Sequence, residues 1–337
     1  MWTKSVEPCS AAVPEVTRYR YTGSGKLEVE LIDIGASIAA IRIPGKDGVV
    51  RDVILGYENV ADYLDNPNCL GCTVGRVANR IKDGHFTFDG KEYQMERNNN
   101  GNLLHSGSGS YHKRRWNSRI DGDAVEFTMD SPDGDGGFPG HFQVTLRYRV
   151  VNDETLELVY EGGTDAPTIV NMTNHSYFNL NGHNSGAIIG HELMIRAAER
   201  TEVIELIPTG KFIPVAGSAF DLNEYRPFTE SVKELPHGFD DNFVLSHDRE
   251  IDAGAFCPES GIRMTCKTTE PGMQLYTAYF LGDAVGKDGY EYGSFGGFCL
   301  EAQHYPDSPN HPEFPSVVLR PGERYRQVTS YTFTVEK

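Results

Sequence analysis

The amino-acid sequence predicts an all-β protein, folded as a single large antiparallel β-sandwich with few short helices. Apolar and polar residues alternate at a period of two along many segments, which is the pattern of a strand with one buried face. Helical periodicity is nearly absent. The 36 glycines and 18 prolines punctuate the chain densely, as expected of many strands joined by turns and loops.

The first predicted strands lie in the N-terminal third of the chain. In residues 26–31, leucine and valine alternate with lysine and glutamate. Residues 86–93 carry Asp89-Gly90 between aromatic positions, and an Asp-Gly pair in such a context is a strong signal of a β-hairpin. A short helical piece is expected around Val60 to Leu64.

The longest predicted strands lie in the middle and at the end of the chain. Residues 142–150 place apolar side chains on one face, turn at Asn152-Asp153 and return through residues 156–160. A turn at Pro321-Gly322 precedes the last strand, which includes residues 331–335. Two paired sheets of such strands form a sandwich, in which polar loops and strand faces line a cleft.

The sequence shows no sign of a domain boundary. No serine- or glycine-rich linker, change of composition or short-period repeat divides it. We therefore expect one domain over residues 1–337, with about residues 1–15 as an N-terminal extension. This length is sufficient to bury a substantial core.

Charge and cysteine content limit the possible partners and compartments. The formal net charge is −17, so neither a nucleic acid nor an anionic membrane is an expected partner. No apolar run approaches the roughly 18 residues of a membrane span. The six cysteines are scattered, unlike a secreted disulfide framework. We expect free thiols and a cytoplasmic protein.

Two dense polar segments, residues 173–180 and 297–306, contain the strongest candidates for catalysis. The first includes His175 and the second Glu301. Model peptides give pKa values of about 6.5 for histidine and about 4.3 for glutamate. If the fold brings the two together, they provide an acid and a base near neutral pH. A neighbouring carboxylate is expected to raise the pKa of the histidine.

Further candidates lie in shorter polar segments, and each also has a structural interpretation. Asn79 and Arg80 suit sugar hydroxyls, but their segment is equally consistent with a salt-bridged loop. His105 ends a turn-rich run and alone is more often structural. Asp240 lies between aromatic residues, as in sugar sites and also in polar turns. Gln274 is expected on a strand after a turn, where an ordinary strand residue is the alternative.

Motifs that would point to a cofactor are incomplete. Asp133 to Gly136 resembles the start of a calcium loop, yet its twelfth position is Val144 where an acidic ligand is required. Cys69-Leu70-Gly71-Cys72 has the CxxC spacing of a zinc site but lacks a second pair. We expect neither a metal nor another cofactor.

The ordered set of segments resembles the aldose 1-epimerase (galactose mutarotase) family. The resemblance spans nearly the whole chain. It rests on residues 75–81, Leu104-His105, residues 133–140, 173–180 and 239–243, Gln274, residues 297–306, Phe314-Pro315 and residues 319–323.

The resemblance implies a galactose mutarotase-like supersandwich, which agrees with the strand pattern. It also implies an isomerase that interconverts the α and β anomers of free hexoses such as galactose and glucose, by acid/base ring opening and reclosure, and so feeds galactose metabolism. Family roles make Glu301 the general base and His175 the general acid, with His105 near the ring oxygen. The implied substrate-binding residues are Asn79, Arg80, His105, Asp240 and Gln274. Close relatives often have histidine where this chain has Asp241.

Three other functions remain open at this level. A glycosidase would use two carboxylates, here Glu301 and Asp240, and would leave His175 without a clear role. A non-catalytic sugar-binding protein would keep Asp240 without needing Glu301. A mutarotase for hexose 6-phosphates would need a phosphate-binding cluster, which the sequence does not place. The preferred aldose and the choice between monomer and homodimer are not determined.

Overall fold

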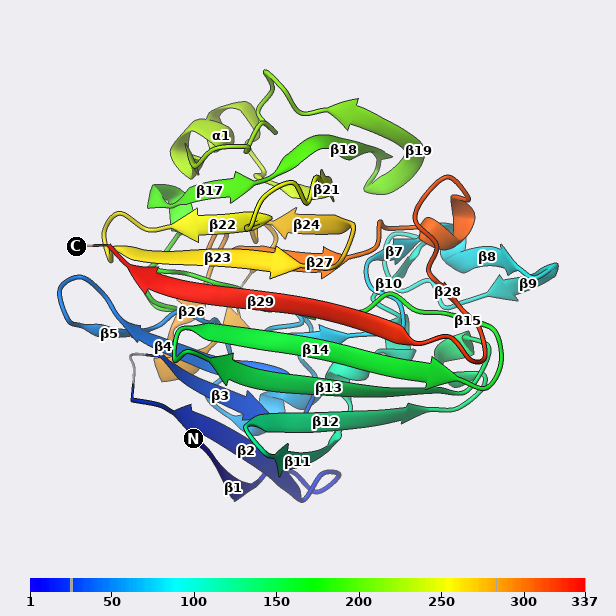
Figure 1. Cartoon of the computed structure of the whole chain (residues 1–337), viewed down its shortest axis with the longest axis horizontal. Helices are drawn as coiled ribbons and strands as arrows, with labels where there is room; N and C mark the ends of the chain where they lie inside the picture. The colour runs from blue at the N-terminus through cyan, green and yellow to red at the C-terminus, as the bar shows by residue number, and fades with distance from the viewer. Residues whose placement is uncertain (25–26, 283, 337) are drawn as a thin grey trace.

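Antiparallel strands form most of the chain in the computed structural model, which describes residues 1–24, 27–282 and 284–336. The largest sheet has nine strands, and the C-terminal strand lies at its centre (Figure 1). In sheet order its strands are β11 (Asn117–Asp121), β12 (Ala124–Ser131), β13 (Phe142–Val151), β14 (Thr155–Thr164), β29 (Tyr325–Val335), β23 (Ile262–Thr268), β22 (Ala253–Phe256), β17 (Glu192–Ile195) and β20 (Arg226–Pro227).

Two five-stranded sheets accompany it. The N-terminal one consists of β1 (Trp2–Pro8), β2 (Glu15–Thr22), β3 (Glu28–Ile32), β4 (Ser37–Pro44) and β5 (Val50–Asp52). The other has the order β19 (Ile207–Pro214), β18 (Ala197–Ile204), β21 (Asp240–Leu245), β24 (Gly272–Tyr276) and β27 (Cys299–Gln303). This second sheet is the one that supports the candidate site.

Short paired strands and helical turns complete the fold. The strand pairs are β6 (Cys72–Val74) with β16 (Thr173–His175), β7 (Arg80–Ile81) with β10 (Leu103–Leu104), β8 (His85–Phe88) with β9 (Lys91–Gln94), β15 (Thr168–Ile169) with β28 (Val318–Leu319), and β25 (Ala284–Val285) with β26 (Glu291–Tyr292). The helices are α1 (Phe228–Glu234) and the 3₁₀ turns η1 (Val60–Leu64), η2 (Lys82–Gly84), η3 (Gly107–Gly109), η4 (Tyr111–Lys113), η5 (Asp135–Gly137), η6 (Ile188–Gly190), η7 (Lys287–Gly289) and η8 (Ser308–Asn310).

One hydrophobic cluster joins side chains from all three large sheets. It includes Leu31 of β3, Leu146 of β13, Met273 of β24 and Phe333 of β29, each at most 4% exposed. The alternation along β13 puts every second side chain into this core, because successive residues of a strand point to opposite faces. The predicted all-β sandwich with few short helices is confirmed.

Local predictions also match the structure. The helical piece predicted around Val60 to Leu64 is the 3₁₀ turn η1. Asp89 and Gly90 have φ values of 47° and 75° in the tight turn between β8 and β9. Positive φ at both central residues is the geometry that favours Asp-Gly in a two-residue hairpin loop.

The N-terminal residues form part of a sheet. Strand β1 pairs with β2 along its whole length, from Trp2 opposite Tyr21 to Pro8 opposite Glu15. The expected single domain and the N-terminal extension stay predictions, although the cluster that runs from Trp2 to Phe333 supports one domain. Within the described residues, no helix has the length and apolar character needed to span a membrane.

Candidate active site

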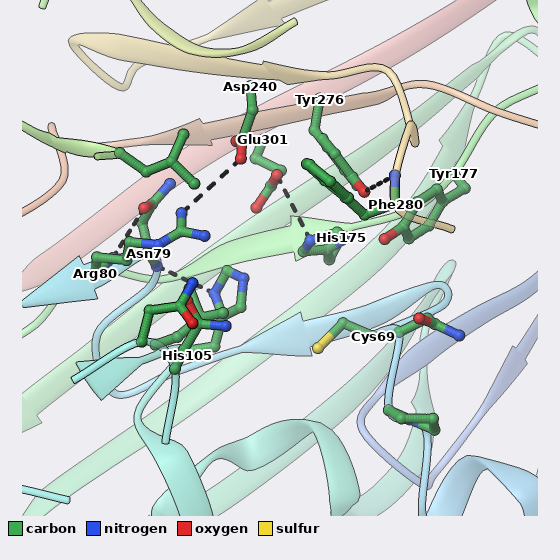
Figure 2. Close-up of a pocket in the computed structure, with 16 residues that line it drawn as sticks. Cys69, Asn79, Arg80, His105, His175, Tyr177, Asp240, Tyr276, Phe280 and Glu301 are labelled. Atoms are coloured by element: carbon green, nitrogen blue, oxygen red, sulfur yellow. Dashed lines mark hydrogen bonds and ion pairs between the residues drawn. The ribbon is translucent and has the colours of Figure 1, made fainter. Parts of the chain in front are cut away.

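A pocket of about 380 Å³ brings together six of the seven residues that the sequence selected. These are Asn79, Arg80, His105, His175, Asp240 and Glu301 (Figure 2). The remaining lining residues are Pro67, Asn68, Cys69, Asn99, Asn100, Leu104, Tyr177, Leu206, Tyr276 and Phe280. The pocket is therefore built from segments that are far apart in the sequence.

Strand geometry explains why Glu301 faces this pocket. Glu301 lies on β27, and its neighbours Leu300 and Ala302 belong to the hydrophobic core. Because side chains alternate across a strand, Glu301 must point to the opposite face. Strand β24 places Gln274 opposite Glu301. His175 arrives from β16, which pairs with β6.

His175 and Glu301 form a close, buried pair. Nε2 of His175 lies 3.6 Å from Oε1 of Glu301, and the residues are 5% and 2% exposed. The second carboxylate oxygen of Glu301, Oε2, has no hydrogen-bond partner among the described residues. The pair can therefore exchange protons with a ligand while one carboxylate oxygen remains free to accept a hydrogen bond.

Burial sets the protonation of this pair. It raises the pKa of Glu301 well above its ordinary value, and the nearby charge of Asp240 acts in the same direction. Burial also lowers the pKa of His175 to about 4. The sequence-based expectation that the carboxylate raises the histidine pKa is wrong, because the loss of solvation outweighs the attraction. Burial therefore favours a neutral His175 and lets Glu301 keep its proton to higher pH than an ordinary glutamate does.

The His105 ring is held in one tautomer. Its Nδ1 accepts a hydrogen bond from the backbone N–H of Asn79 at 3.1 Å, so the hydrogen of the neutral ring resides on Nε2. Burial, followed by the nearby His175 and Arg80, lowers the pKa of His105 well below its ordinary value. His105 thus stays neutral and offers an N–H donor beside His175, whose ring centre is 5.3 Å away.

Asp240 is the second carboxylate that lines the pocket, and Gln274 is hydrogen-bonded to it. Nε2 of Gln274 donates to Oδ1 of Asp240 at 2.7 Å, and Nη1 of Arg80 lies 4.0 Å from Oδ2. Gln274 is 3% exposed and does not line the pocket. Direct substrate binding by Gln274 stays a prediction, and its contact in the structure is with Asp240.

The two adjacent aspartates have different surroundings. Asp241 does not line the pocket and instead pairs with Arg200 at 3.2 Å. Burial raises the pKa of Asp241 to about 6. The doubled acid in the sequence thus places one carboxylate in the pocket and the other in an ion pair.

The two arginines of residues 75–81 also differ. Arg80 lines the pocket, whereas Arg76 is 1% exposed. The Arg76 guanidinium donates to the backbone carbonyls of Pro139 and Gly140 at 2.8 and 2.9 Å. Arg76 therefore has a structural role, and sugar binding by Arg80 stays a prediction.

Sequence reasoning did not single out the aromatic residues of the pocket. The Tyr177 ring lies 5.1 Å from that of His175. The Tyr276 hydroxyl accepts a hydrogen bond from the backbone N–H of Phe280 at 3.1 Å, which holds the 68% exposed Phe280 at the rim. With 17 tyrosines and 17 phenylalanines in the chain, residue type alone could not identify these three.

The donor set of the pocket is a poor match for a metal ion. One atom each from His105, His175 and Glu301 lies within 4.8 Å of the others. However, the Asn79 amide occupies Nδ1 of His105, and a protonated Nε2 has no lone pair to offer a metal. The described residues thus supply two suitable ligands here, fewer than the three protein ligands of a catalytic zinc site.

Comparison with known proteins identifies the family. The family model described as "Aldose 1-epimerase" matches residues 17–332. The chain belongs to the aldose 1-epimerase family. Its relatives include the galactose mutarotase of Sus scrofa, which is 41% identical over 93% of this chain and 92% of its own length. The aldose 1-epimerase of Escherichia coli K12 is 35% identical over 97% of this chain and 98% of its own length.

Solved structures of family members share the fold. The GalM/aldose epimerase homologue from C. elegans superimposes with a TM-score of 0.89 at 31% identity, covering 94% of this chain and 98% of that one. A galactose 1-epimerase from Lactobacillus acidophilus gives a TM-score of 0.86 at 23% identity, covering 100% and 99%. The family and fold class expected from the sequence are thus confirmed.

Proposed function

We propose that this pocket interconverts the α and β anomers of free aldohexoses such as galactose and glucose, with Glu301 as general base and His175 as general acid. Family membership makes the chain an epimerase with mutarotase activity on aldoses. The observation that supports the residue assignment is the buried contact between Nε2 of His175 and Oε1 of Glu301 at 3.6 Å.

The proximity of the two residues suits a cyclic hemiacetal. Its ring oxygen O5 and its hydroxyl oxygen O1 are bonded to the same carbon, C1. Opening the ring removes a proton from O1 and adds one to O5, so base and acid must lie close together. Holding the sugar between Glu301 and His175 makes both transfers intramolecular, which removes the entropic cost of assembling the groups.

The proposed reaction is balanced in protons and electron pairs. Glu301 takes the proton of the C1 hydroxyl, the C1–O5 bond breaks, and His175 transfers its proton to O5. Rotation about C1–C2 then presents the other face of the aldehyde to the C5 hydroxyl. Closure reverses both transfers, so each residue regains its starting protonation. Each positioned proton transfer contributes roughly 10²–10⁴-fold to the rate.

One unpartnered oxygen in the pocket supports the change in protonation that this cycle requires. The C1 hydroxyl can donate to the unpartnered Oε2 of Glu301, and a hydrogen bond to a carboxylate favours its ionised form. The proton is then carried by His175. Ring opening returns the pair to a protonated Glu301 and a neutral His175, which is the state that burial favours. The Nε2–H of His105 is available to donate a hydrogen bond to the ring oxygen O5 of the sugar.

The pH dependence of kcat/KM is expected to be a broad bell. The active pair carries one proton. The pKa of His175 is lowered to about 4, so a second proton binds only at lower pH. The raised pKa of Glu301 keeps the single proton bound to correspondingly higher pH. Polarimetric rates, corrected for spontaneous mutarotation at every pH, test this. An acid limb near the ordinary histidine value of about 6.5 would contradict it.

Activity is expected to survive exhaustive chelation. Proton transfer between Glu301, His175 and the sugar requires no Lewis acid, and the Asn79 amide occupies the ring nitrogen that His105 would need free. Mutarotation is measured before and after dialysis against EDTA, with metal-free buffer as the control. Loss of activity that added zinc restores would overturn this prediction.

Polarimetry on freshly dissolved α-galactose and α-glucose tests the proposed function directly. The purified protein should accelerate the approach of the optical rotation to equilibrium. It should release no nitrophenol from nitrophenyl glycosides, which separates it from a glycosidase. Parallel assays with hexose 6-phosphates should show slower catalysis than with free hexoses. Absence of acceleration with both free sugars would refute the proposal.

A further inference from the structure

The inner ring nitrogen of His175 has a partner that the mechanism above does not use. Sγ of Cys299 lies 3.6 Å from Nδ1 of His175, within the range of a hydrogen bond to sulfur. Cys299 lies on β27 two residues before Glu301, so the two side chains point to the same face of that strand. One strand thus supplies the partners of both ring nitrogens.

We propose that Cys299 is a positioning residue that orients His175 and lets it act both as an acid and as a base. This inference rests on the proposed role of His175. A thiol is a weak donor and a weak acceptor. It can therefore accept from a protonated Nδ1 and donate to an unprotonated one, and it favours the protonated ring much less than a carboxylate partner would.

The reversibility of mutarotation explains why such a partner is suitable. His175 must release a proton when the ring opens and recover it when the ring closes. In a Ser-His-Asp triad the partner is a carboxylate, which stabilises the imidazolium form. Cys299 is 0% exposed, and burial, followed by the charge of Glu301, raises its thiol pKa well above the ordinary value. Cys299 thus remains a neutral thiol and adds no such charge.

The remaining neighbours of His175 do not replace this contact. Glu301 faces Nε2, and the rings of Tyr177 and His105 face the imidazole at 5.1 and 5.3 Å. His112 of η4 is near enough for His175 to lower the His112 pKa, although burial is the larger cause.

Two further thiols lie near, because Cys72 is opposite His175 in the β6–β16 pair and Cys69 lines the same pocket. A backbone hydrogen bond of His175 itself raises the ring pKa but is outweighed by burial. The side chain in contact with Nδ1 is that of Cys299.

Two substitutions at Cys299 and one matched control test the inference. Cys299→Ala removes the partner and should lower kcat about 3- to 10-fold, the loss expected for one hydrogen bond, with little change in KM. Its acid limb should move to lower pH. Cys299→Ser supplies a stronger donor and acceptor, so it should retain most of kcat while its acid limb moves to higher pH. Cys266→Ala removes a buried strand cysteine in the core and should leave the profile unchanged.

A spectroscopic measurement without sugar separates this inference from the proposed function. ¹⁵N NMR of histidine-labelled protein reports the protonation of Nδ1 and Nε2. Both Cys299 variants should shift the His175 signals, and Cys266→Ala should not. If the His175 signals and acid limb of both Cys299 variants coincide with those of Cys266→Ala, the inference is wrong. If Cys299→Ser folds and Cys299→Ala does not, the acid limb and the His175 signals of Cys299→Ser alone decide whether the inference holds. Failure of His175 as the acid would instead appear as a normal rate in His175→Asn.

Discussion

Glu301→Gln is expected to lower kcat by at least about 10²-fold, with sugar binding largely retained. The amide keeps the size of the side chain and can still accept a hydrogen bond from the C1 hydroxyl. It cannot take up the proton, so the ring cannot open by the proposed route. Initial rates of the change in optical rotation, measured over a range of sugar concentrations, give kcat. Equilibrium binding of galactose measures the affinity separately.

Asp241→Asn is the matched control for this substitution. It also converts a largely buried carboxyl, 13% exposed, into an amide, but Asp241 pairs with Arg200 and lies outside the pocket lining. We expect Asp241→Asn to stay within about threefold of the wild-type rate. A Glu301→Gln variant within about twofold of wild type would remove Glu301 from the mechanism.

His175→Asn is expected to lower kcat by about 10²-fold and to change the shape of the pH profile. Of the catalytic pair, this variant keeps only Glu301, and Glu301 must be ionised to act as a base. The rate should therefore rise with pH through the raised pKa of Glu301 and then stay level. The alkaline limb of the wild-type bell should disappear, because that limb reports the loss of the proton shared by the pair.

The opposite profile is expected for Glu301→Gln, whose residual rate should fall as His175 loses its proton. His141→Asn provides the control for His175→Asn, because His141 pairs with the exposed Asp130 outside the pocket, and its rate and profile should match wild type. If His175→Asn keeps the alkaline limb and a near-normal rate, the proposed proton donor is the wrong residue.

The sequence predicted a strand well wherever alternation of apolar and polar residues within that one segment defined it. Period-two alternation over residues 142–150 and 156–160 became β13 and β14, because one buried face imposes that alternation on any strand. The position of β29 between β14 and β23 was not predictable in this way. Pairing of distant strands depends on the complementarity of the whole sheet, which no local pattern contains.

For the site, the sequence by itself determined the residue types and their ordered motifs. These indicated the family, which the comparisons confirm, and they led to the proposal of His175 as the acid and Glu301 as the base. Tertiary structure alone decided how those residues behave. Burial removes water from Glu301 and His175 and moves their pKa values in directions opposite to those a simple ion pair would give. It also brings the Gln274 amide into hydrogen-bond contact with Asp240 and fixes the tautomer of His105. Solvation and hydrogen-bond partners come from atoms of distant segments, so only the folded chain determines them.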